Sequence, residues 1–210
     1  MQNPISILLV ENCLFTRIGV SEVLKREDDF KIVGEADSGA RGLKLFKKLK
    51  PQVVILALRL PDSCAVDVIE KYLAIAPETK ILVFAEHTGD AEIRNTFKKG
   101  ALGFIRKDVM VKEAFVKALR TVSAGQKYIP SEIAEIISEN VTGDDITPTE
   151  KKILEMMVKG LSNKQIAFEQ NISINTVKSH LQKIFDKLGA PNRISAAVIA
   201  VKRGFIHFDF

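Results

Sequence analysis

Between two prolines the chain reads Pro51-Gln52-Val53-Val54-Ile55-Leu56-Ala57-Leu58-Arg59-Leu60-Pro61. The centre of this stretch, Val53 to Ala57, is a short apolar run rich in β-branched residues, as is typical of a strand buried on both faces. Four further runs of the same kind lie within the first 125 residues, and stretches with helical spacing separate them. These runs are Ile5 to Val10, Lys31 to Ala36, Lys80 to Phe84 and Gly103 to Arg106.

This alternation predicts an α/β fold for residues 1–125, a doubly wound five-stranded parallel sheet. Pro51, Pro61, Pro77 and Gly100 fall at the breaks, where chain reversals are expected. In such a sheet the functional crevice lies at the carboxyl ends of the strands. The first helical stretch is spaced by Phe15, Ile18, Gly19, Val23 and Leu24.

From Thr147 onward the pattern is wholly helical, which predicts an all-α domain over residues 147–210. Thr147 and Glu150 have the spacing of a capping box, and Pro148 suits the first helical position. Residues 126–146 are expected to hold one more helix, Pro130 to Asn140, and a polar linker, Val141 to Asp145. The first expected helix of the second domain is capped by Thr147 and ends at Gly160, and the second, capped by Ser162, runs from Asn163 to Gln170. The third is capped by Ser173 or Asn175 and runs through to Leu188, and the last covers Arg193 to Arg203.

The composition argues against several classes of protein. No apolar run approaches the roughly 20 residues of a membrane helix, and the N-terminus lacks the basic region of a signal peptide, so a cytoplasmic location is expected. Two cysteines and three histidines have no metal-site spacing, and no catalytic constellation is present, so we expect no metal, no cofactor and no enzyme activity. The net charge of +5 is only weak evidence for nucleic acid.

Two predicted helices joined by a tight turn would place the second across the first, so that its N-terminal end can enter a major groove of duplex DNA. On that second helix Val177, Leu181, Ile184 and Leu188 have the spacing of a buried face. The polar residues expected to reach bases or phosphates are Ser162, Asn163, Lys164, Thr176, Lys178, Ser179, Gln182 and Lys183. A solvated basic helix on a bundle is the alternative, and His180 is expected to have a structural role.

Residues 146–206 resemble the LuxR-type helix-turn-helix of the NarL/FixJ response regulators. The resemblance rests on Thr147-Pro148-Thr149-Glu150, Leu161-Ser162-Asn163-Lys164-Gln165-Ile166-Ala167, Thr176-Val177-Lys178-Ser179-His180 and Lys187-Leu188-Gly189. It implies that Lys178, Ser179 and Gln182 face the groove. It also implies a homodimer formed through the last helix, with contacts at Ala196, Val198, Ile199 and Lys202.

Residues 4–125 resemble a receiver domain of the same regulators. The matching pieces are Ile7 to Asn12, Pro51 to Pro61 and Gly100 to Asp108. Receivers accept a phosphoryl group on an aspartate of their own and hold Mg²⁺ with further carboxylates. A lysine and a hydroxyl contact the phosphoryl oxygens. At those positions this chain has Ala57 for the aspartate, Glu11 and Asn12 for the acidic pair, Ala85 for the hydroxyl, Lys107 for the lysine and Phe104 for the aromatic switch residue.

A methyl group cannot accept phosphate, so the resemblance predicts a receiver that has lost its phosphoacceptor. A substitute acceptor at Asp62 or Asp67 is not expected, because both lie beyond the strand. We hypothesise that Lys107 pairs with Glu11 instead, the alternative being a lysine in solvent. We also hypothesise that the Phe104 ring lies inward, the alternative being ordinary strand-end packing.

The sequence therefore predicts a sequence-specific DNA-binding transcription regulator, with duplex DNA and a second copy of the chain as partners, that works without aspartyl phosphorylation. The rival interpretations are a conventional phosphorylated regulator and a module that uses the receiver pocket for protein interaction or for sensing a small ligand. A redox input through Cys13 and Cys64 is another alternative to plain reduced thiols.

Overall fold

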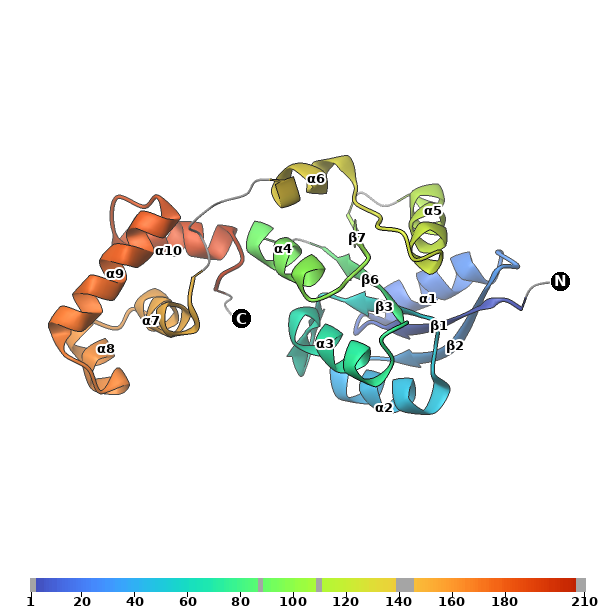
Figure 1. The fold of residues 1–210 in the computed structure, drawn as a ribbon, viewed down its shortest axis with the longest axis horizontal. Helices are drawn as coiled ribbons and strands as arrows, with labels where there is room; N and C mark the ends of the chain where they lie inside the picture. Colours follow the sequence, from blue (N-terminus) through green and yellow to red (C-terminus); the bar gives the residue numbers. More distant parts are fainter. Residues whose placement is uncertain (1–2, 87–88, 109–110, 139–145, 207–210) are drawn as a thin grey trace. The chain divides into compact units, whose positions relative to one another are not determined.

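The computed structural model describes residues 3–86, 89–108, 111–138 and 146–206. The chain divides into two compact units, one built mainly from the first 136 residues and the other mainly from residues 137–210. Figure 1 shows the sheet-containing unit and the helical unit. None of the described helices is long and apolar enough to cross a membrane.

The first unit is built on a five-stranded parallel sheet, which confirms the predicted fold class. In space the strands lie in the order β2-β1-β3-β6-β7. From β1 the chain first adds β2 on one side and then β3, β6 and β7 on the other, and the crevice of such sheets lies at this change of direction, between β1 and β3. All five residues of β3 are buried, as its unbroken apolar sequence requires. The strands are β1 (Ile5–Val10), β2 (Phe30–Ala36), β3 (Val53–Ala57), β6 (Lys80–Ala85) and β7 (Gly103–Arg106).

Helices cover both faces of this sheet (Figure 1). One apolar cluster joins α1 (Leu14–Leu24) and α5 (Lys112–Ser123) to the strands from one side. On the other side α2 (Gly39–Leu49) packs closely, because a Cβ at Gly42 would come within 2.7 Å of the Tyr72 hydroxyl on α3 (Ala65–Ile75). The helix α4 (Asp90–Lys98) lies between β6 and β7 in the chain.

The helical spacing of α1 does not mark its buried face. Val20 and Leu24 are buried, but Phe15 is 82% exposed and Ile18 is 51% exposed. The spacing correctly predicted a helix, but with only 11 residues the pattern could not fix which side meets the sheet.

A short hairpin of β4 (Arg59–Leu60) and β5 (Ser63–Cys64) follows β3 and was not predicted. Asp62, at its turn, accepts hydrogen bonds from the backbone amides of Gly39 at 2.7 Å and Ala40 at 2.8 Å. These donors lie in the first turn of α2, so Asp62 caps that helix from another part of the chain. The same hydrogen bonds, from Ala40 and then Gly39, lower the pKa of the Asp62 carboxyl.

The second unit packs four helices around one apolar core. They are α7 (Pro148–Val158), α8 (Asn163–Gln170), α9 (Ile174–Leu188) and α10 (Arg193–Lys202), and α6 (Ser131–Ser138) precedes them in the chain. Thr147 and Glu150 form the predicted capping box, and Ser162 forms another with Gln165. Ser173 rather than Asn175 caps α9. The expected linker from Val141 to Asp145 lies outside the described residues.

Candidate nucleic-acid interface and receiver pocket

The helix-turn-helix is formed by α8 and α9. Asn171 ends α8 in the left-handed conformation, with φ of 51°, which turns the chain within three residues into α9. Ser173 then accepts a hydrogen bond from the Thr176 amide at 3.0 Å. The turn is therefore held at both ends, and the N-terminus of α9 is left open to solvent.

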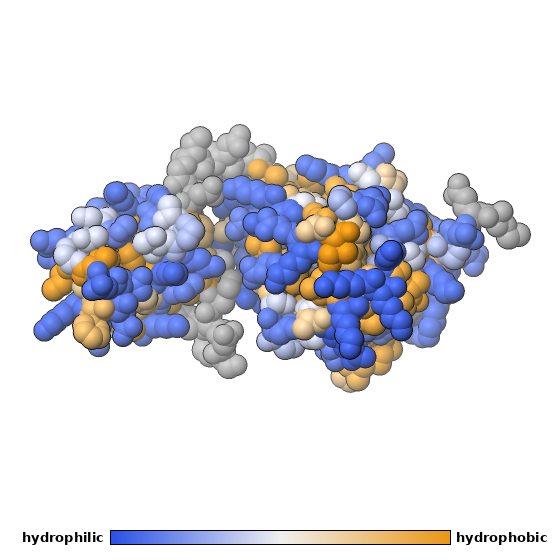
Figure 2. All heavy atoms as spheres, turned by 60° about the horizontal axis from the view of Figure 1, so that its bottom comes forward, coloured by the Kyte–Doolittle hydropathy of each residue, from blue (hydrophilic) through white to orange (hydrophobic). Residues whose placement is uncertain are grey.

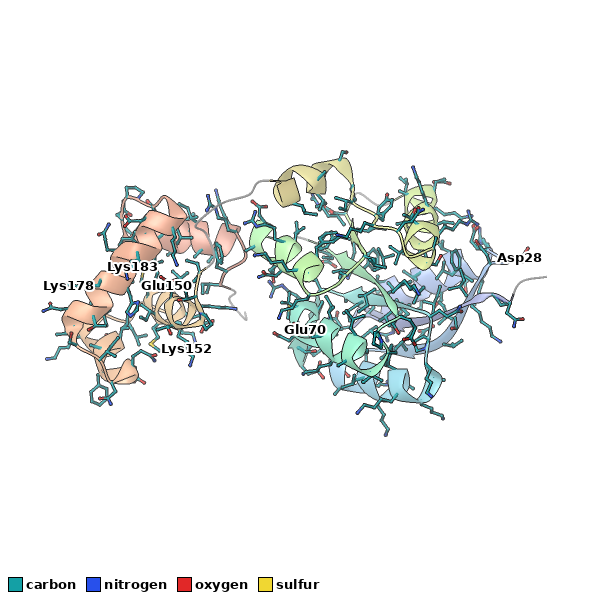
Figure 3. All side chains as sticks on the ribbon, viewed as in Figure 1. Asp28, Glu70, Glu150, Lys152, Lys178 and Lys183 are labelled. Atoms are coloured by element: carbon teal, nitrogen blue, oxygen red, sulfur yellow. The ribbon has the colours of Figure 1, made fainter. Side chains whose placement is uncertain are left out.

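The buried face of α9 is the predicted one, since Val177, Leu181, Ile184 and Leu188 all lie in the core. The opposite face is exposed, and Figure 3 shows Lys178 and Lys183 on it. Neither lysine forms an ion pair with a described residue. Ser179 and Gln182 are also exposed; Ser179 donates a hydrogen bond to the Asn175 carbonyl, and Gln182 donates one to Asp186.

The predicted residues at the helix starts are partly engaged in the fold. The Ser162 hydroxyl donates to Gln165 at 2.8 Å and accepts from its amide, and the Thr176 amide and hydroxyl both contact Ser173. Both residues act as parts of helix caps and remain exposed, so their contact with phosphates stays a prediction. Lys164 is exposed, and Asn163 is half-buried at the start of α8.

Two cations for which no structural role was predicted from the sequence connect the helices of this unit. Lys187 at the end of α9 contacts Glu150 at the start of α7, 2.6 Å away. Burial of Glu150 opposes its ionisation, but the hydrogen bonds from Lys187 and Thr147 prevail and lower the pKa of the carboxyl. Arg193 donates to two carbonyls, those of Met157 at 2.8 Å and Leu161 at 2.6 Å, and so joins α10 to the chain between α7 and α8.

The expected dimer contact on α10 needs one correction. Ala196 is 0% exposed and belongs to the core, so it is closed to a partner. Val198 is 49% exposed, Ile199 is half-buried and Lys202 is exposed. The exposed apolar residues of this helix are Ile194, Val198 and Val201, at the i, i+4 and i+7 positions of one face.

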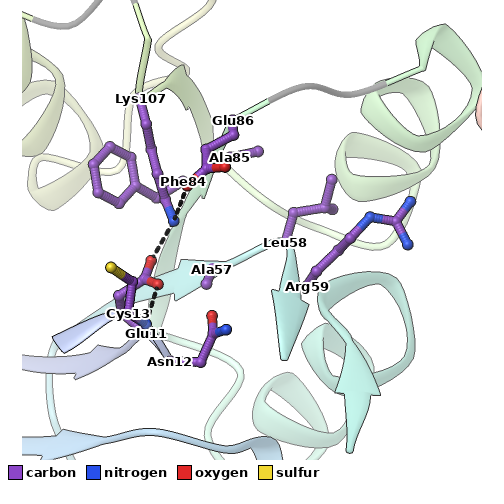
Figure 4. Close-up of a pocket in the computed structure, with 10 residues that line it drawn as sticks. All are labelled: Glu11, Asn12, Cys13, Ala57, Leu58, Arg59, Phe84, Ala85, Glu86 and Lys107. Carbon is purple, nitrogen blue, oxygen red and sulfur yellow. Dashed lines mark hydrogen bonds and ion pairs between the residues drawn. The ribbon is translucent and has the colours of Figure 1, made fainter. Parts of the chain in front are cut away.

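The first unit has a cavity at the carboxyl ends of β1, β3 and β6, with a volume of about 260 Å³ (Figure 4). Ala57 and Ala85 lie in its wall where the resemblance places the phosphoacceptor and the hydroxyl. Phe104 does not line it, and neither do Asp62 and Asp67. The lining residues are Glu11, Asn12, Cys13, Ala57, Leu58, Arg59, Phe84, Ala85, Glu86 and Lys107.

Lys107 and Glu11 form the hypothesised pair, with Nζ 2.6 Å from Oε2 (Figure 4). The Glu11 side chain is 1% exposed and that of Lys107 is 14% exposed, so the contact is largely shielded from water. The other carboxylate oxygen of Glu11 accepts from the Cys13 amide at 2.8 Å. Lys107 also lies 5.3 Å from the centre of the Phe84 ring and 3.8 Å from the exposed Glu86. The buried carboxylate is therefore neutralised from within the chain.

Receivers bind Mg²⁺ through oxygen ligands, and the donors here do not fit that ion. When the amide of Asn12 is oriented to satisfy its hydrogen bonds, its nitrogen donates to Glu11 at 3.1 Å and to the Arg59 carbonyl at 3.2 Å. A donor nitrogen thus occupies the place beside these two oxygens where an oxygen ligand would be needed, and Ala57 supplies no oxygen at all. Among the described residues no group of three or more His, Cys, Asp or Glu side chains is placed to hold a metal.

The Phe104 ring is fully buried, which is consistent with both the inward placement and ordinary strand-end packing, while Phe84 supplies the aromatic surface of the cavity. Cys13 and Cys64 are both free thiols, and only Cys13 lines the cavity. Hydrogen bonds from Thr16 lower the pKa of the Cys13 thiol.

A receiver-type α/β unit followed by a helix-turn-helix unit defines a two-domain regulator of transcription. Residues 7–120 match the model of the response regulator receiver domain, and residues 144–200 match that of bacterial regulatory proteins of the luxR family. The chain therefore belongs to the luxR-family response regulators, which are DNA-binding transcription regulators.

The relatives and neighbours agree with this assignment along nearly the whole chain. The nitrate/nitrite response regulator NarL of Escherichia coli K12 is 29% identical, covering 94% of this chain and 95% of NarL. The transcriptional regulatory protein MctR of Rhizobium johnstonii is 30% identical, covering 96% and 95%. RcsB of Salmonella enterica serovar Typhimurium, solved bound to the promoter P1flhDC, shares the fold with a TM-score of 0.72 at 20% identity, covering 96% and 99%.

Proposed function

We propose that this protein is a cytoplasmic, non-enzymatic regulator that binds specific DNA sequences through α9, as a homodimer, and that its receiver works without aspartyl phosphorylation. Its domains are the receiver at residues 1–125, a helix and linker at 126–146, and the helix-turn-helix at 147–210. The observation that carries the proposal is Ala57 in the cavity wall, because its methyl side chain has no carboxylate to accept phosphate. The Lys107–Glu11 pair supports it, because the lysine that would meet a phosphoryl group is already engaged.

The charge of the helical unit supports DNA as the ligand. Residues 146–206 contain ten Lys and Arg residues but only four Asp and Glu residues. Positive charge of this density favours a polyanion and makes affinity fall steeply with salt. Lys178, Ser179, Gln182 and Lys183 form the open face of α9. The other residues proposed to contact DNA lie at the starts of α8 and α9 and are Ser162, Asn163, Lys164 and Thr176.

A second copy of the chain is proposed to pack against the exposed apolar residues of α10. Ile194 and Val201 join Val198 on that face, with Lys202 at its edge, while Ala196 supports the helix from inside. Paired half-sites about one helical turn apart are then expected on the DNA.

The DNA-binding part is tested with Lys178→Ala and Gln182→Ala on promoter fragments. Lys178→Ala should weaken binding to all sequences, because its ammonium contacts phosphate, and Gln182→Ala should relax preference at one base pair by about 1–3 kcal/mol. Lys152→Ala is a matched control, since Lys152 is an exposed lysine of the same unit on α7 (Figure 3). Parent-like binding by both α9 variants would refute the assigned face.

The receiver part is tested by incubating the protein with acetyl phosphate and Mg²⁺ and measuring its intact mass. No phosphoryl adduct is expected on the parent. The triple variant Asn12→Asp, Ala57→Asp, Ala85→Thr restores the missing oxygen groups and serves as the positive control. An adduct on the parent, located at Asp62 or Asp67 by peptide mapping, would refute phosphorylation independence.

A further inference from the structure

The helix α2 carries an unusual concentration of one charge. Residues 39–50 contain five cations and no acidic residue. The inward side of the helix is fixed, because Gly39, Gly42 and Phe46 are buried. All five cations are therefore exposed: Arg41, Lys44, Lys47, Lys48 and Lys50. Figure 2 brings this side of the unit forward and shows hydrophilic residues gathered over it.

Four of these cations have no partner among the described residues. Arg41 alone is paired, with Asp37 at 3.3 Å. Elsewhere on the same unit ion pairs are common, for example Lys99 with Glu70 at 2.7 Å and Arg120 with Asp29 at 2.7 Å. Lysines that surround one another on a helix repel, so the group lowers helix stability rather than raising it. The dipole of the helix favours cations only in its last turn, which accounts for Lys47 and Lys48 but leaves Lys44 unexplained.

We infer that α2 is a second DNA-contacting surface, which binds backbone phosphates without reading sequence. This inference rests on the proposed function, because the helix-turn-helix brings the DNA to the chain. Once that unit is bound, the tethered receiver meets the duplex at a high effective concentration. Lysines on flexible stems bind phosphates as point charges and need no particular base. Such a contact adds affinity to a regulator whose receiver has no phosphorylation to strengthen it.

The test compares two triple variants of the full-length chain with equal charge loss. One is Lys44→Gln, Lys47→Gln, Lys48→Gln on α2. The matched control replaces three exposed and unpaired lysines elsewhere on the same unit, as Lys31→Gln, Lys117→Gln, Lys127→Gln. Binding to a mixed-sequence duplex of about 60 base pairs is measured from about 50 to 200 mM KCl, because the slope of log affinity against log salt counts phosphate contacts at about 0.9 each.

The α2 variant should have a slope shallower by about 2–3 and an affinity at least about tenfold weaker in the middle of that salt range, while the control keeps the parent slope. Equal slopes in parent, α2 variant and control would overturn the inference, and if Lys178→Ala still weakens binding the proposed function stands. An α2 variant that binds DNA like the parent but loses binding to vesicles with about 30% anionic lipid would assign the surface to a membrane, which also overturns the inference.

Discussion

Replacing Lys107 with methionine tests whether the receiver cavity is neutralised from within. The change removes the ammonium 2.6 Å from Glu11 and leaves a carboxylate that is 1% exposed. Breaking a buried ion pair from one side costs about 3–5 kcal/mol. The amides of Cys13 and Asn12 still face Glu11, so the loss should fall at or somewhat below the lower limit of that range, at about 2–3 kcal/mol.

The double variant Glu11→Gln, Lys107→Met removes the stranded charge and should recover most of this loss, because a neutral amide can still accept from the Cys13 backbone. Urea unfolding of the full chain measures both. Tyrosine fluorescence reports on the first unit alone, since the chain has no tryptophan and both tyrosines, Tyr72 and Tyr128, belong to that unit. A fall of about 1–2 M in the urea midpoint is expected for the single variant.

The reasoning is refuted if Lys107→Met alone changes the free energy of unfolding by less than about 0.5 kcal/mol, or if the effects of the two substitutions simply add. Either result would mean that water, not Lys107, stabilises the carboxylate.

Three further predictions concern helix ends. Arg193→Ala should lower the stability of the helical unit by about 2–3 kcal/mol, seen in circular dichroism melting, and Arg193→Lys should recover little because an ammonium cannot span both carbonyls. Asp62→Asn should cost only about 0.5 kcal/mol at neutral pH, because the carboxylate is exposed. Its folded pKa is lowered, so its contribution is present above the unfolded value near 4 and is lost as the pH falls through the folded pKa; a difference in urea midpoint between parent and variant that does not shrink on acidification would contradict this. Glu150→Gln should cost about 1 kcal/mol through the lost Lys187 contact, with the same sign of pH dependence, and a difference that grows on acidification would count against it.

The strands and most helices were predictable because each carries a local signal. Val53 to Ala57 is apolar without interruption, and the structure has a buried strand with the same bounds. Asn163 to Gln170 was framed by Ser162 as its cap, and α8 has those bounds as well. The periodicity of apolar residues alone did not always predict which face of a helix is buried. Phe15 and Ala196 both fit an apolar helical pattern, yet Phe15 is exposed and Ala196 is buried, because the neighbouring elements select the face that is covered.

The candidate sites were predictable only where a motif fixed the position of a residue. Lys107 and Glu11 were paired correctly because they lie at the carboxyl ends of strands that meet at one edge of the sheet. Asp62 was dismissed as an acceptor of phosphate, but its role as the cap of α2 depends on a contact across 23 positions of sequence, for which no local signal exists. Arg193 was missed for the same reason.

The β4–β5 hairpin connects two features of the first unit. Arg59 lines the cavity and pairs with Cys64 in the hairpin, while the Asp62 carboxylate at the turn accepts hydrogen bonds from the first two backbone amides of α2. Only four residues of chain, Arg59 to Asp62, therefore join the lining of the cavity to the capped end of α2, and a substitution in this segment bears on both.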